Sequence, residues 1–207
     1  MARYTGPVCR LCRREGRKLF LKGQRCYGDK CAIERGRPVP GEPGKTARPR
    51  VSGYAVHLRE KQAVKRMYGI VEAQMKRYYE IAAKSAGKTG EILLQLLERR
   101  LDNVVFRAGF APSRRTARQL VVHGHVLVNG RKVDRPSYQV KVGDVITLKE
   151  KSREIPIVKE TFEKSKEIPR WIEVDSANWT AKIIDLPRRE DMPQDIREEL
   201  IVEFYSR

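Results

Sequence analysis

Residues 113–133 read SRRTARQLVVHGHVLVNGRKV, a pattern typical of a helix that leads into a β-hairpin. Ser113 can cap the helix by accepting a hydrogen bond from its first turn, and Gly124 can end it in a left-handed conformation. The apolar run after Gly124 leads to Asn129-Gly130, a pair that tolerates the two positive φ angles of a type I′ turn. A helix followed directly by a hairpin indicates an α+β fold.

Apolar periodicity extends this interpretation to the rest of the chain. Spacings of three and four residues predict helices, whereas short apolar runs bounded by glycine, proline or aspartate predict strands. We expect helices over residues 54–68, 71–86, 91–107 and 193–200, and strands over residues 138–142, 145–148, 171–174 and 181–184.

All four cysteines of the chain, Cys9, Cys12, Cys26 and Cys31, lie within its first 31 residues. Two close pairs separated by a short loop suit one tetrahedral Zn²⁺ ion, and four thiolate ligands close the site, so the metal would be structural. An iron–sulfur cluster on the same ligands is a minor alternative. Free thiols and a pair of disulfides are the remaining alternatives for the four cysteines.

The charge of the chain predicts a polyanionic partner. The net charge is +18 and the pI is about 10.0. Residues 1–60 carry 15 basic and 5 acidic side chains, residues 61–150 carry 18 and 8, and residues 151–207 carry 11 and 13. Nucleic acid fits this field better than a membrane does, because no apolar run approaches 18 residues. The opening residues contain no apolar leader, so we expect a reducing cytosolic location, where clustered cysteines hold metal more often than disulfides.

The start of the helix after Ser113 is a candidate phosphate site. Free backbone N–H groups, the helix dipole and the guanidinium groups of Arg114 and Arg115 would act together there. A solvated charged face is the alternative interpretation. His123 and His125 lack a nearby acid or cysteine that would complete a metal site. Tyrosines in the basic part of the chain, among them Tyr27, could stack on RNA bases, although core packing is the better interpretation for those at helical spacing.

Catalytic motifs are absent from the sequence. It contains no Walker loop, no Gly-x-Gly-x-x-Gly and no Gly-x-Ser-x-Gly. We therefore expect no enzyme and no small-molecule substrate. An RNA-modifying enzyme is one alternative, but it would need a further catalytic domain. A zinc-dependent DNA-binding regulator is another, and comparable affinities for duplex DNA and folded RNA would favour it.

Several blocks of the chain resemble the bacterial ribosomal protein S4 family in its zinc-binding form. They include MARYTGPVCRLCRREG at residues 1–16, LREKQ at 58–62, RLDNVVFR at 100–107 and LIVEFYSR at 200–207. The arm over residues 38–45 is similar to the family's arm but lacks its usual Gln-His, and residues 154–192 match only loosely.

The resemblance implies an N-terminal zinc knob and a mainly helical domain with an inserted S4 RNA-binding module, in which two helices pack on a small antiparallel sheet. It also implies a primary binder of small-subunit rRNA that recognises a folded junction in the 5′ domain and nucleates assembly of the subunit body. Ribosomal protein S5, through which the family influences translational accuracy, other small-subunit proteins and mRNA near its path into the ribosome are the further partners implied.

These expectations divide the chain into a zinc knob (1–34), an extended arm (35–52), a helical domain (53–97), the S4 module (98–163) and a C-terminal segment (164–207) that partly returns to the helical domain. The expected zinc ligands are the four cysteines. The expected RNA-binding residues are Arg3, Arg10, Arg13, Arg14, Lys22, Arg35, Arg37, Lys45, Arg48, Arg50, Arg59, Lys61, Lys65, Arg66, Arg114, Arg115, Arg118, His123, Arg131 and Lys132.

Overall fold

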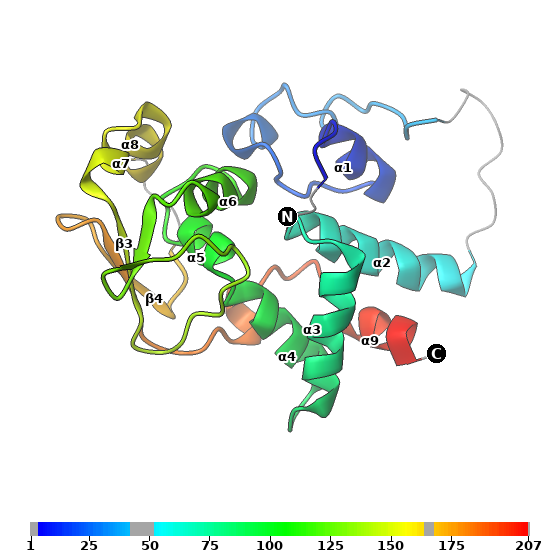
Figure 1. The fold of residues 1–207 in the computed structure, drawn as a ribbon. Helices are drawn as coiled ribbons and strands as arrows, with labels where there is room; N and C mark the ends of the chain where they lie inside the picture. Colours follow the sequence, from blue (N-terminus) through cyan, green and yellow to red (C-terminus); the bar gives the residue numbers. More distant parts are fainter. Residues whose placement is uncertain (1–3, 42–51, 164–167, 207) are drawn as a thin grey trace. The chain divides into compact units, whose positions relative to one another are not determined.

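The computed structural model has an α+β fold, as the sequence predicted (Figure 1). None of the helices it describes is long and apolar enough to cross a membrane. The structure describes residues 4–41, 52–163 and 168–206. Four predicted RNA-binding residues, Arg3, Lys45, Arg48 and Arg50, lie outside these ranges.

The chain divides into two compact units. Unit 1 contains residues 1–90 and 195–207, and unit 2 contains residues 91–194. The boundaries expected from the sequence, after residues 34, 52, 97 and 163, divide the chain more finely. Residues from the two ends of the sequence therefore belong to one unit, and the intervening residues form the other.

Unit 1 is built from helices, and the two predicted between residues 54 and 86 are confirmed. The hydroxyl of Ser52 accepts a hydrogen bond from the backbone N–H of Ala55 at 3.2 Å, which caps α2 (Gly53–Met67). Gly69 follows that helix with φ +62°, a conformation that stops it. α9 (Glu198–Ser206) packs against α2 and α3 (Glu72–Lys84), as Figure 1 shows. The described elements are α1 (Cys9–Glu15), η1 (Gly23–Cys26), α2 (Gly53–Met67), α3 (Glu72–Lys84), the start of α4 (Thr89–Glu98) and α9 (Glu198–Ser206).

The final helix lies later in the chain than predicted. We expected it over residues 193–200, whereas α9 begins at Glu198 and continues to Ser206. Side chains hold the preceding residues in a turn: Gln194 donates to backbone carbonyl oxygens of η2 (Arg189–Asp191) and its neighbours, at 2.9 to 3.1 Å. The backbone N–H of Arg197 donates to Glu60 at 3.1 Å, outside any helical pattern.

The single helix expected over residues 91–107 is wrong, because the chain forms α4 and then α5 (Leu101–Arg107). Arg100 between them has an extended backbone and bridges to Gln139. Its buried guanidinium binds Asp102 through two hydrogen bonds, of 3.0 and 2.7 Å. The apolar spacing continues across this break and conceals it in the sequence.

Unit 2 contains one antiparallel sheet with the strand order β2-β1-β3-β5-β4. The predicted hairpin is confirmed, with Asn129 at φ +50° and Gly130 at φ +76°. The strand expected over residues 138–142 is wrong, because these residues make only the bridge at Gln139 and β3 pairs with β1 and β5 instead. The strands are β1 (Val126–Val128), β2 (Arg131–Lys132), β3 (Val145–Leu148), β4 (Ile172–Asp175) and β5 (Thr180–Ile183).

The core of unit 2 lies where α5 and α6 (Arg114–Val122) meet the sheet. It unites buried side chains of both helices, of β1, β3, β4 and β5, and of Trp171. α8 (Pro156–Glu163), preceded by α7 (Glu150–Arg153), adds Phe162, whose ring stacks on Trp179 with 4.1 Å between centroids. This part of the chain therefore buries a continuous apolar core.

Candidate functional site

The four cysteines occupy one short segment of unit 1. Cys9 and Cys12 lie on α1, which ends at Gly16 with φ +68°. Cys26 ends η1, and the backbone N–H of Cys31 bonds to the carbonyl of Gly28 at 3.0 Å. All four are free thiols, and each except the half-buried Cys9 is buried.

The electrostatics of this segment couple the four sulfurs. Burial raises the pKa of the Cys12 and Cys26 thiols, and the charges of the other cysteines raise it further. Backbone N–H groups oppose this effect, since that of Leu19 bonds to Cys12 and that of Lys22 lies 3.3 Å from the Cys26 sulfur. Amides directed at sulfur favour the thiolate, which is the form that binds metal.

Within the described ranges, no three His, Cys, Asp or Glu side chains converge closely enough to hold a metal ion. The donor set suits a soft cation, because it offers four thiols with amide support, but the sulfurs would have to draw together around it. The zinc knob thus stays a prediction.

An ion-pair network lies between α1 and α2, and it includes two of the predicted RNA-binding arginines. Glu15 on α1 is almost fully buried and pairs with Arg66 and, at 3.3 Å, with Arg59. Burial raises the pKa of Glu15, while the two arginines lower it. Arg17 donates to Glu60 on α2 at 2.9 Å. Arg59 and Arg66 therefore have acidic partners within the protein.

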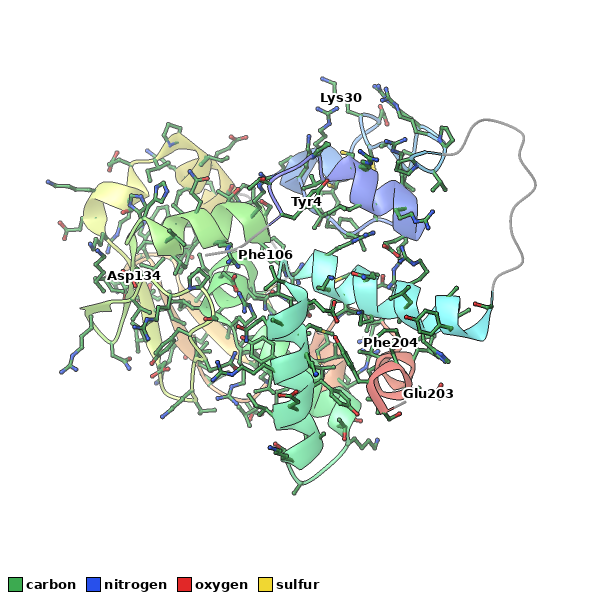
Figure 2. All side chains as sticks on the ribbon, turned by 45° about the vertical axis from the view of Figure 1, so that its right-hand side comes forward. Tyr4, Lys30, Phe106, Asp134, Glu203 and Phe204 are labelled. Carbon is green, nitrogen blue, oxygen red and sulfur yellow. The ribbon has the colours of Figure 1, made fainter. Side chains whose placement is uncertain are left out.

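A second cluster joins α2, α3 and α9 and involves two predicted RNA-binding lysines. The buried Lys61 and the partly buried Lys65 contact the two oxygens of Glu72 at 2.7 and 2.9 Å. The hydroxyl of Tyr205 donates to Glu72 at 2.7 Å, and Lys61 lies 4.4 Å from the ring centre of Phe204. Figure 2 shows Phe204 on α9. Partial burial disfavours the charged form of Glu72, yet the donors outweigh burial and lower its pKa to about 2.

The start of α6 is capped as predicted, but two of its three arginines turn inward. Ser113 accepts from the backbone N–H of Thr116 at 3.2 Å. Arg114 donates to Asn103 at 2.6 Å and packs on the ring of Phe106, with 4.8 Å to its centre. Arg118 is buried and contacts Asp102 at 3.4 Å.

The acidic partners of these arginines were missed from the sequence. Glu98 and Asp102 are both buried, and Glu98 also binds Arg107 at 2.9 Å. Their neighbours in sequence gave no sign of burial, because acidic residues scattered among basic ones are typical of ion pairs on the solvent-exposed face of a helix. Only the tertiary packing brings Asp102 to Arg118, 16 residues away.

The predicted RNA-binding residues that remain exposed lie in two places. Within residues 4–41 they are Arg10, Arg14, Lys22, Arg35 and Arg37, and within unit 2 they are Arg115, His123, Arg131 and Lys132. Arg13 is partly buried and donates to the carbonyl of Pro38 at 2.8 Å. Arg25 and Lys30 are also exposed and were left out of the predicted set, although the density of cations around the cysteines could have identified them. Figure 2 shows Lys30 on the side of its segment away from α2.

Comparisons with known proteins match two adjacent parts of the sequence to family models. Residues 3–98 match the family model of the ribosomal protein S4/S9 N-terminal domain, and residues 99–146 match that of the S4 domain. Small ribosomal subunit protein uS4 of Halothermothrix orenii is 57% identical over 209 residues, and that of Acidobacterium capsulatum is 54% identical over 209 residues. Protein uS4A of Alkaliphilus metalliredigens is 56% identical over 208 residues, and each alignment covers 100% of both chains.

The chain belongs to the uS4 family of small ribosomal subunit proteins. The family expected from the sequence is therefore confirmed, while its zinc-binding form is not addressed by these matches. The S4 domain match includes α5, α6, β1 and β2 and stops inside β3. Strands β5 and β4 lie beyond it, so this uS4 chain completes the sheet with residues that follow the matched domain.

Proposed function

We propose that this chain is a structural, non-enzymatic, rRNA-binding component of the small ribosomal subunit in the cytoplasm. The observation that carries the proposal is the full-length similarity to small ribosomal subunit proteins uS4. The net charge of +18 and the exposed cations near the cysteines and on the hairpin supply the physical basis.

The proposed target is a folded junction in the 5′ domain of small-subunit rRNA, where the protein nucleates assembly of the subunit body. Folded RNA presents phosphates in a fixed arrangement, and cations on a rigid surface recognise that arrangement with little reading of bases. Contacts with ribosomal protein S5, by which translational accuracy is influenced, with other small-subunit proteins, and with mRNA near its path into the ribosome belong to the same proposal.

The same proposal assigns one structural Zn²⁺ ion to Cys9, Cys12, Cys26 and Cys31. Its support is the set of four thiols on one segment, with backbone amides directed at Cys12 and Cys26. A bound ion would supply folding energy by joining α1 to the residues around η1. Four thiolates on Zn²⁺ carry a net charge of −2, which the exposed Arg10 and Arg14 would offset.

The experiment is a titration of naked small-subunit rRNA with the full chain over a range of salt concentrations. Affinity should fall steeply with salt, because each phosphate contact adds about 0.7–0.9 to the slope of log K against log salt. The triple variant Arg10→Gln, Arg14→Gln and Lys22→Gln should lower that slope by roughly two to three.

The matched control replaces two exposed lysines of the less basic C-terminal part, Lys151→Gln and Lys159→Gln, and should leave the slope nearly unchanged. A nearly salt-independent affinity in the wild-type chain would contradict the proposal. Equal affinity for duplex DNA of the same length would favour a DNA-binding regulator instead.

A further inference from the structure

Two aromatic rings are exposed on the cysteine segment, which we define as residues 9–31. Tyr27 is 70% exposed and Phe20 is 37% exposed. Their ring centres lie 5.2 Å apart, with an angle of 33° between the planes. Tyr68 and Tyr78 of the same unit are buried, as expected of tyrosines at helical spacing. The pair at Phe20 and Tyr27 therefore has an aromatic surface that packing within the protein leaves open.

The backbone at Phe20 holds its ring at the surface. Phe20 has φ +50°, in the left-handed region that a bulky residue rarely adopts. The residue before it, Leu19, is completely buried, and Gly23 shortly after is buried too. The loop thus anchors Leu19 inside and turns Phe20 outward. Such strain persists where the surrounding structure imposes it, and it concentrates at binding sites.

Cations surround this pair in the sequence and are exposed. Lys22 and Arg25 lie between the two aromatic residues, and Lys30 follows three residues after Tyr27. Lys18, by contrast, pairs with Glu34. Exposed rings among exposed cations fit single-stranded nucleic acid, because a base stacks on the ring while the cations hold the phosphates. A surface that bound only phosphates would leave the exposed rings of Phe20 and Tyr27 without a binding partner on the nucleic acid.

We propose that Phe20 and Tyr27 form a stacking platform for one unpaired nucleobase of the bound RNA, with Lys22, Arg25 and Lys30 on the adjoining phosphates. This inference rests on the proposed rRNA binding and adds a base contact to a surface otherwise built for phosphate. It specifies a single-stranded element of the RNA next to the cysteine segment.

The test compares variants of Tyr27 in the full chain, with naked small-subunit rRNA as the probe at one fixed salt concentration. Tyr27→Leu removes the aromatic face and should weaken binding about 5- to 150-fold, the loss expected for one stacked base. Its salt slope should stay at the wild-type value, because no cation is lost. Tyr27→Phe keeps the ring and should bind like the wild type.

Two further variants separate stacking from folding. Phe20→Gly removes the ring at a position where glycine adopts φ +50° without strain, so a loss of affinity cannot come from backbone strain. Tyr4→Leu, which replaces another exposed tyrosine of unit 1, is the control and should bind nearly as the wild type does (Figure 2). Circular dichroism of each variant should match the wild type.

Base-specific chemical probing of the complex gives the second measurement. One unpaired base should be protected by the wild type and by Tyr27→Phe, and reactive with Tyr27→Leu. If the wild type binds rRNA, and Tyr27→Leu shows the same affinity and the same base protection, the platform is wrong but the proposed function stands. The two exposed rings would then be assigned to contact with a protein partner. Failure of the wild type to bind rRNA would overturn the proposed function and the platform with it.

Discussion

Residues 4–41 and unit 2 hold their structures by different means. Unit 2 has a continuous apolar core drawn from three helices, four strands and Trp171. In residues 4–41, the buried apolar side chains are Val8, Leu19 and three of the four cysteines. A segment with so small a core needs an additional constraint, which is usually a disulfide or a metal ion. Ion pairs with α2 supply part of it, and we propose that a metal on the four free cysteines supplies the rest.

The two regions also place their cations differently. In unit 2, Arg100, Arg114 and Arg118 are directed at buried acids or amides, so they stabilise the fold. In residues 4–41, most arginines and lysines are exposed. Unit 2 thus keeps several cations inside, whereas residues 4–41, for which we propose a metal, leave most of their cations exposed.

The largest expected effect comes from the double variant Cys12→Ser and Cys26→Ser. Structural zinc contributes on the order of 10–16 kcal/mol to small zinc modules, comparable with the stability of a whole domain. Amide hydrogen exchange should therefore show lost protection over residues 4–41 and unchanged protection in α5 and α6. Gln24→Ser, an exposed change in η1, should preserve protection. Full protection of the segment in the double variant would mean that it needs no metal.

The next effect concerns the buried charges of unit 2. Asp102→Ala leaves the guanidinium of Arg100, with its side chain 2% exposed, without its main partner. Loss of one partner of a buried ion pair costs about 3–5 kcal/mol. Urea unfolding followed by far-UV circular dichroism should show this loss, while Asp134→Ala, at an exposed aspartate of the same unit, should change stability by less than about 0.5 kcal/mol. A loss below about 1 kcal/mol for Asp102→Ala would show that Arg100 finds other partners.

A smaller effect is expected where α1 meets α2. Glu15→Ala removes the acceptor oxygen that Arg59 and Arg66 share, and should destabilise unit 1 by about 1–3 kcal/mol, because partly buried guanidinium donors then lose their partner. Thermal unfolding measures this loss. Glu34→Ala, at the more exposed pair with Lys18, serves as control and should cost less than about 1 kcal/mol. Equal losses would contradict a special role for the buried site.

The smallest effect is a pH dependence at Glu72. Its pKa lies at about 2, below the ordinary value of 4.5 for a glutamate. Its contribution to stability is therefore fully present above about pH 4.5 and is lost as the pH falls through about 2. Glu72 is 45% exposed, so solvent limits this contribution to about 1 kcal/mol or less.

Urea unfolding between pH 2 and pH 6 should show a gap between the wild type and Glu72→Gln that closes in acid. The gap for Glu80→Gln, an exposed position of α3, should be near zero throughout. A constant gap for Glu72→Gln across this range would show that its ionisation is not coupled to folding.

Local chemistry allowed much of the fold to be predicted from the sequence. The cap at Ser113 and the turn at Asn129-Gly130 depend on residues next to them, and both are observed. The break at Arg100 could not be predicted, since it depends on an ion pair with Asp102 and a bridge to Gln139. The apolar periodicity continues through that break.

The candidate site was predictable only in part, for the same reason. Composition identified the basic segment and the cysteines, but not which cations face water. Lys61 and Arg118 are of the same residue types as the exposed RNA-binding candidates. Both are nevertheless buried and paired, Lys61 with Glu72 and Arg118 with Asp102. The left-handed backbone of Phe20 gives no signal in the sequence either, because left-handed conformations are expected at glycine or asparagine.

The most direct test of the account measures metal content and rRNA affinity on the same purified protein, before and after treatment with a zinc chelator. We predict one Zn²⁺ ion per chain and at least a tenfold weaker affinity for small-subunit rRNA after its removal, with affinity restored when Zn²⁺ is added back. A chain purified without metal that binds the RNA with the same affinity before and after chelation would contradict the account.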